Sequence, residues 1–83
     1  MSETFALLTP VDGITELTLD EPTVAEIKKL SADTAKHGAV EALVMLIAGQ
    51  SQQPVTVINK IRARDFKRIE KWFGAFFEEP QET

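Results

Sequence analysis

Two short runs near the N-terminus predict β-strands, because the first is rich in residues that suit a strand and the second alternates between apolar and polar side chains. They cover residues 4–8 and 14–19, and an Asp12-Gly13 pair lies in the segment between them. Asp-Gly adopts positive φ angles at little cost and favours the tight turn of a hairpin. We therefore expect an antiparallel β-hairpin, which needs other elements to pack on. Its register stays open, because Ile14 is out of phase with the apolar residues that follow it.

Apolar residues at helical spacing follow the hairpin and predict a first helix over about residues 22–36. Its apolar face is marked by Val24, Ile27 and Leu30. The start is open by one or two residues, because Pro22 suits the first helical position while Thr23 and Glu26 match a capping box. We expect this helix to end before Gly38, which suits a left-handed helix cap.

A second helix is expected over residues 39–48, closed by Gly49 and followed by a polar loop at residues 50–53. Apolar residues lie on nearly every side of this helix, which predicts that it is the central one. Residues 54–61 fit two structures. The spacing of Val55, Ile58 and Ile61 favours a short helix, whereas the β-branched run at residues 55–58 is also compatible with a strand.

The last helix is expected over residues 63–78. Its apolar stripe consists of Phe66, Ile69, Phe73 and Phe76, and Trp72 and Phe77 widen that stripe. The other side carries Arg64, Lys67, Arg68 and Lys71. We therefore predict an α+β fold in which an N-terminal antiparallel β-hairpin is followed by about three helices, with the small helical bundle packed on the hairpin. A single domain would span residues 1–79, and residues 80–83 would form a frayed polar tail.

Side chains that could carry out catalysis or hold a metal are scarce. There is no cysteine, and the one histidine, His37, stands at an expected helix end. Nucleophilic catalysis needs a nucleophile, a base and an orienting group, and metal sites usually combine His or Cys with carboxylates. The adjacent pairs Asp20-Glu21 and Glu78-Glu79 do not face one another on a helix. The sequence therefore predicts no catalytic residue, metal site or cofactor, and a protein that is not an enzyme.

The apolar segments are short. The longest run, residues 42–48, falls well below the roughly 20 residues that cross a bilayer. The first residues also lack the basic segment of a secretory signal. Together with the absence of cysteine, these features predict a soluble intracellular protein that has no contact with a membrane.

Basic residues are concentrated in one stretch, although the net charge is -4 and the pI is about 4.9. Six of the nine lie within residues 60–71. This stretch fits either a solvated helix face or a docking stripe for an acidic partner. One thin layer cannot bury every ring of the last helix, so one or two of Trp72, Phe76 and Phe77 should stay exposed. Whether Trp72 is a core or a contact residue stays open.

The candidate partner-binding residues are therefore Arg64, Lys67, Arg68, Lys71, Trp72, Phe76 and Phe77. The alternative function is a small regulatory nucleic-acid-binding module that uses the basic helix at residues 62–77. The acidic pI argues against nucleic acid as the partner, because carboxylates elsewhere on the domain repel phosphates.

Three features in this order resemble a known protein family. They are the Leu-Thr-Leu-x-Glu-Pro-Thr passage at residues 17–23, the Ala-Gly-Gln-Ser segment at residues 48–51, and the spacing from Asp65 to the aromatic end. Over roughly residues 6–77 the chain resembles the small tail assembly chaperones of Mu-like and related contractile-tailed bacteriophages and prophages, of the tail protein E type. Each motif alone has low specificity, and the order and spacing of the motifs carry the resemblance.

The resemblance implies a non-enzymatic function without catalytic residues. Proteins of this type look like binders of the tape measure protein, a long, mostly helical and aggregation-prone chain around which the tail tube polymerises. Expected partners are therefore the tape measure protein and the tail tube protein, and self-association through the same surface is left open. The expected location is the cytoplasm of the bacterial host cell, with no place in the finished virion.

Overall fold

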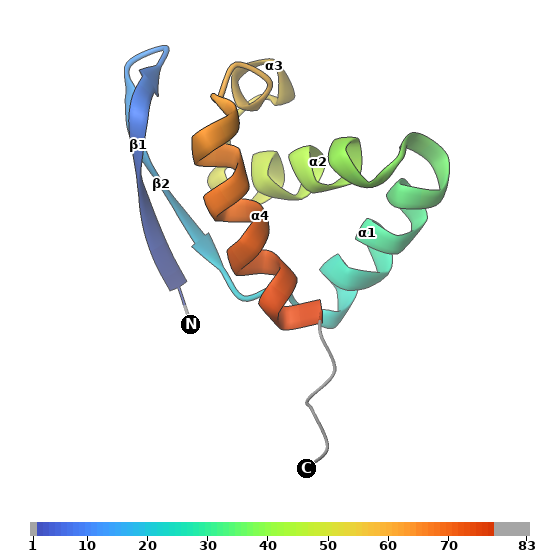
Figure 1. Ribbon diagram of the computed structural model, residues 1–83. Helices are drawn as coiled ribbons and strands as arrows, with labels where there is room; N and C mark the ends of the chain where they lie inside the picture. The colour runs from blue at the N-terminus through green and yellow to red at the C-terminus, as the bar shows by residue number, and fades with distance from the viewer. Residues whose placement is uncertain (1, 78–83) are drawn as a thin grey trace.

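The computed structural model describes residues 2–77, which form a two-stranded hairpin followed by four helices (Figure 1). The elements are β1 (Ser2–Val11), β2 (Ile14–Asp20), α1 (Val24–His37), α2 (Ala39–Ser51), α3 (Val55–Ile58) and α4 (Ala63–Phe77). This order confirms the predicted α+β class, with an N-terminal antiparallel hairpin before the helices. The expected extension of the last helix to Glu78, the domain end at residue 79 and the frayed tail at 80–83 lie outside the described residues.

The hairpin turns at the predicted Asp-Gly pair. Asp12 and Gly13 have φ angles of 49° and 82°, and two positive φ values give the chain reversal the right-handed twist that paired strands need. The expected loop was too long, however, because Thr9 and Pro10 lie within β1. Strand β1 accommodates them by a register shift between Ala6 and Val11, where its longer segment faces a shorter one in β2. Proline is tolerated at such a bulge because no ladder hydrogen bond is required of it there.

One face of the hairpin forms the floor of the core. Its buried side chains are Phe5, Leu7, Leu17 and Leu19. Helix α2 contacts β2 and helix α4 contacts β1, so these two helices cover that face. The core is completed by Leu43, Val44, Ile47, Ala48, Ile58, Ile69 and Phe73. Leu43, Val44 and Ile47 all belong to α2, which agrees with the prediction that this helix is central.

Helix α1 begins with the capping box. The Thr23 hydroxyl accepts from the Glu26 N–H at 3.1 Å, and the Glu26 carboxylate accepts from the Thr23 N–H at 2.9 Å. The helix therefore starts at Val24, and Pro22 precedes the cap instead of opening the helix. No residue of α1 is buried, and α1 packs on α2. In Figure 1, α1 and the hairpin lie on opposite sides, with α2 and α4 between them.

Helix α2 is longer than the sequence predicted. It continues through Gly49 to Ser51, and the left-handed cap is Gln52, with φ of 58°. The Ser51 hydroxyl donates to the Ile47 carbonyl at 2.6 Å in the last turn. A glycine inside a helix costs only about 1 kcal/mol, so Gly49 alone was too weak a stop signal. The expected polar loop accordingly begins two residues later than predicted.

Helix α3 resolves the ambiguity of residues 54–61 in favour of the helix. Pro54 precedes the four helical residues, Ile58 is buried, and Val55 and Ile61 pack partly against the core. Between residues 2 and 77, no helix combines the length and apolar character needed to cross a membrane.

Gln50 joins two of the three sequence features that carry the family resemblance, residues 17–23 and residues 48–51. Its side-chain oxygen accepts from the Asp20 N–H at 2.9 Å, and its amide nitrogen donates to the Glu26 carboxylate at 3.2 and 3.3 Å. Gln50 lies in the last turn of α2, whereas Asp20 ends β2 and Glu26 belongs to the first turn of α1. One amide therefore holds the ends of three elements together.

Candidate partner-binding surface

A buried carboxylate sets the position of α4 on the hairpin. Asp65 is 1% exposed, and its two oxygens accept from the Leu8 N–H at 3.0 Å and the Thr9 N–H at 3.3 Å. Both N–H groups belong to the bulged part of β1, where pairing with β2 is interrupted. The carboxylate thus supplies acceptors where the sheet provides none, as buried backbone groups require.

The charge of Asp65 is stabilised in the fold. Burial raises the pKa of this carboxyl, but hydrogen bonds from the Leu8 N–H, the Arg68 guanidinium and the Thr9 N–H outweigh burial. The resulting pKa lies below the ordinary value of 3.8. In the sequence, Asp65 stood out only as the start of a motif spacing that reaches the aromatic end. A signal was present, because Asp65 precedes the buried Ile69 by four residues and so shares its helix face.

The Arg68 side chain forms hydrogen bonds to other residues of the protein. Its guanidinium donates to Asp65 Oδ1 at 2.6 Å and to the Ala6 carbonyl at 2.5 Å, and its side chain is 44% exposed. Of the four basic residues predicted to face a partner, Arg68 therefore already uses donors to hold α4 against β1.

The other three predicted basic residues lie along one exposed side of α4, which we call the basic face. It consists of Arg64, Lys67 and Lys71, at i, i+3 and i+7 spacing. Lys67 pairs with Glu70 at 3.2 Å, but both side chains are solvated, and such pairs contribute at most about 1 kcal/mol. The pair therefore leaves Lys67 available to a partner.

The aromatic residues of α4 divide into packed and open ones. Trp72 is half-buried and makes edge-to-face contacts with Phe5, Phe73 and Phe76 at centroid distances of 5.5, 5.0 and 4.9 Å. Such contacts add to the energy of burial. Phe77 is 39% exposed. The structure thus seats Trp72 and Phe76 mainly in a cluster against the hairpin and leaves Phe77 as the open ring.

An apolar depression opens where α2, α3 and α4 meet. Its volume is about 230 Å³, and its lining consists of Val40, Val44, Ile58, Asn59, Ile61, Ala63 and Phe66. Val40 is 62% exposed, which is unusual for a residue on the apolar stripe of a central helix. The sequence pattern placed Phe66 on the apolar stripe of the last helix and apolar residues on nearly every side of α2. That pattern does not predict the depression, because its lining comes from three elements.

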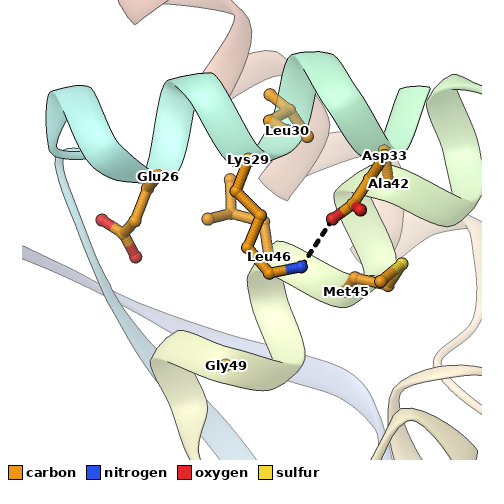
Figure 2. A pocket seen from close by; sticks show the side chains of 8 residues that line it. All are labelled: Glu26, Lys29, Leu30, Asp33, Ala42, Met45, Leu46 and Gly49. Carbon is orange, nitrogen blue, oxygen red and sulfur yellow. Dashed lines mark hydrogen bonds and ion pairs between the residues drawn. The ribbon is translucent and has the colours of Figure 1, made fainter. Parts of the chain in front are cut away.

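A smaller pocket lies between α1 and α2 (Figure 2). Its volume is about 100 Å³, and Ala42 and Gly49 leave this space because their side chains are small. Figure 2 shows the Lys29 ammonium meeting the Asp33 carboxylate, at 2.8 Å, while the Glu26 carboxylate points away from them. Both hollows are smaller than the roughly 300–1,000 Å³ of small-molecule sites, so they suit protein side chains or a few waters.

His37, the only histidine in the sequence, is exposed at the C-terminal end of α1. Among residues 2–77, no cluster of three or more His, Cys, Asp or Glu side chains is arranged to hold a metal ion. The chemistry that the described surface does offer is hydrogen bonding, charge and exposed apolar area.

Comparison with known proteins gives one match. A family described as "Phage tail assembly chaperone proteins, E, or 41 or 14" matches residues 11–78. The matched region includes β2, all four helices and both motifs joined by Gln50. No curated protein and no solved structure matches the chain.

Proposed function

The chain belongs to the family of phage tail assembly chaperones, and on this premise we propose that it binds the tape measure protein of a contractile phage tail. Binding would keep that long helical chain soluble until the tail tube protein polymerises around it. We place this work in the cytoplasm of the bacterial host cell, before the virion is complete. The chaperone would then leave and have no place in the finished particle.

The observation that carries this proposal is an exposed cationic surface on a chain that is acidic overall. Residues 54–77 hold six basic and two acidic side chains, whereas residues 2–53 hold three basic and eight acidic ones. Such segregation along the chain favours the approach of an acidic segment to the part formed by α3 and α4. Charge complementarity of this kind speeds and orients association more than it strengthens the final complex.

Apolar area beside the basic face would supply the holding energy. Phe77 follows the basic face on α4, and Val40 lies at the depression near the start of the same helix. Amphipathic helices commonly bind by placing apolar residues into a groove, with charged residues at the rim. We therefore propose a helical segment of the tape measure protein as the ligand, bound along α4. The predicted contact residues Arg64, Lys67, Lys71 and Phe77 remain available there, with Arg68, Trp72 and Phe76 in supporting positions.

The experiment is co-expression with a tape measure protein from the same phage or prophage. We expect the tape measure protein to move from the pellet to the soluble fraction and to elute with the chaperone from a sizing column. An unrelated acidic protein of similar size serves as the control for a general effect of co-expression. A tape measure protein that stays insoluble, with the chaperone eluting alone, would reject the proposal.

Nucleic-acid binding through residues 62–77 is the competing hypothesis. It is less well supported because Arg68 is engaged with Asp65 and because the chain carries thirteen acidic residues against nine basic ones. Phosphate binding is driven by unpaired cations and weakens steeply with salt. Retention of the chaperone on DNA or RNA at physiological salt, lost in the double variant Arg62→Glu/Arg64→Glu, would favour the competing hypothesis.

A further inference from the structure

We infer that the apolar depression between α2, α3 and α4 is the anchor point for the partner, and that it takes an apolar side chain from an acidic amphipathic helix. The inference rests on the proposed function and adds the place and the chemistry of recognition. The sequence pattern predicts apolar contacts at the aromatic end of α4. The structure puts the larger opening at the other end of that helix.

Most of the residues that line the depression are apolar, so it suits an apolar side chain. Six of its seven lining residues are apolar, and Asn59 is the exception. Val44 and Ile58 are buried at its floor, whereas Val40 at its rim is 62% exposed. Water in contact with this concave apolar surface would be released when a side chain fills it, which favours binding.

Along the segment that joins α3 to α4, basic residues alternate in the sequence with residues that line the depression. Lys60 lies between Asn59 and Ile61 in the chain, and Arg62 lies between Ile61 and Ala63. Lys67 lies one helical turn beyond Ala63. The rim is therefore cationic over the part that α3 and α4 contribute.

Two of these cations are partly neutralised by neighbouring acids. Lys60 pairs with Asp12 at 3.1 Å, and Lys67 pairs with Glu70 at 3.2 Å. Arg62 and Arg64 are exposed and form no ion pair with another described residue. Guanidinium groups bind carboxylates through two parallel hydrogen bonds, so these two residues suit the Asp and Glu side chains of a partner helix.

An acidic amphipathic helix fits the depression and its basic neighbours better than a nucleic acid or a second copy of the chain does. A nucleic-acid backbone offers phosphates for the arginines but no aliphatic group for the depression. A second copy of the chain would most readily offer α1, its exposed helix, but the sequence of α1 holds three lysines against Glu26 and Asp33. An acidic amphipathic helix from another protein satisfies both the apolar floor and the cationic rim.

The first test compares Val40→Glu with Val24→Glu. Both valines are exposed, at 62% and 70%, so neither change empties the core, but Val24 lies on α1 and does not line the depression. We expect Val40→Glu to weaken binding of the tape measure protein about tenfold or more, and Val24→Glu to change it less than about twofold. Equal effects of the two substitutions, with both variants folded by circular dichroism, would overturn the inference.

The second test uses designed peptides, so it does not depend on the tape measure protein. Two helical peptides share one apolar face and carry either glutamates or lysines on the polar face. We expect tighter binding of the acidic peptide, with NMR shift changes concentrated at Val40, Ile61 and Ala63. The double variant Arg62→Glu/Arg64→Glu should lose this preference, whereas Lys28→Glu/Lys36→Glu on α1 should keep it.

These outcomes separate the inference from the proposed function. Binding of the acidic peptide in the depression without binding of the tape measure protein would reject the proposed function and support the inference. If the tape measure protein binds and Val40→Glu leaves its affinity unchanged, the proposed function is supported and the inference is rejected. Equal binding of the two peptides, shift changes outside the depression, or a self-associated chain that Val40→Glu dissociates would overturn the inference.

Discussion

Asp65 shows how one side chain can replace part of a sheet. The register of β1 with β2 shifts between Ala6 and Val11, and in this segment the Asp65 carboxylate accepts from the Leu8 and Thr9 N–H groups. A buried charge is costly unless it is paired and hydrogen-bonded, and here Arg68 provides the pairing at 2.6 Å. Because these bonds join α4 to β1, they also determine which side of α4 faces solvent. The basic face therefore depends on a residue that belongs to the core.

We predict that Asp65→Asn lowers the free energy of unfolding by about 2–4 kcal/mol. The amide keeps the shape of the side chain but turns an NH2 group toward donors, so at least one N–H or the guanidinium loses its acceptor. Urea unfolding followed by Trp72 fluorescence measures the change. Asp12→Asn is the matched control, because Asp12 forms an exposed ion pair with Lys60, and its loss should cost less than about 1 kcal/mol.

The same carboxylate predicts how stability depends on pH. Its pKa in the folded state lies below 3.8, so the unfolded chain takes up this proton first as the pH falls. The stabilisation is present above that value and is lost as the pH falls through the lower pKa of the folded state. Asp65→Asn should therefore flatten the acid limb of a plot of stability against pH. An unchanged acid limb in the variant would contradict the role that we give to this charge.

At the scale of elements, turns and helix ends could be predicted from neighbouring residues where no contact with a distant part of the chain changes them. The Asp-Gly turn was predicted, and the Thr23–Glu26 capping box was one of the two helix starts that the sequence left open, because two or three neighbouring residues determine each. The predicted end of α2 at residue 48 was wrong. The helix continues past Gly49 because Gln50, in its last turn, forms hydrogen bonds with Asp20 of β2 and Glu26 of α1. No signal inside residues 48–53 reports those partners.

The candidate site follows the same division. The basic face could be predicted from the spacing of residues 64, 67 and 71 on one helix. The internal role of Arg68 and the partial packing of Trp72 could not, because both depend on how α4 lies against β1. The depression around Val40 could not be predicted either, because its lining comes from three elements and the sequence pattern does not specify the angles between them.

We predict that Gln50→Ala lowers the free energy of unfolding by about 1–2 kcal/mol. The substitution removes the amide that accepts from the Asp20 N–H of β2 and donates to the Glu26 carboxylate of α1. Gln53→Ala is the control, since the Gln53 side chain makes no hydrogen bond to a described residue. Thermal melts of the two variants give the comparison. Equal melting temperatures would mean that the bridge among β2, α1 and α2 is unimportant to the fold.

At the scale of the whole molecule, the exposed charges that we assign to recognition lie apart from the side chains that form the core. The hairpin, α2 and α4 share the core, whereas α1 packs on α2 with none of its residues buried. The cationic surplus lies at the α3–α4 side and the acidic surplus lies elsewhere in the chain. Changes in exposed charge should thus alter association strongly and folding little.

This separation leads to a prediction about salt. Raising the ionic strength from about 0.05 to 0.5 M should slow association with the tape measure protein about tenfold, because screening shortens the reach of the basic face. The free energy of unfolding should change by less than about 1 kcal/mol, since the pairs that link exposed side chains contribute little. Lys71→Gln should lower both the association rate and its salt dependence, whereas Lys28→Gln on α1 should not. Stopped-flow kinetics of the two variants measures this, and an association rate that salt leaves unchanged would show that apolar contact alone selects the partner.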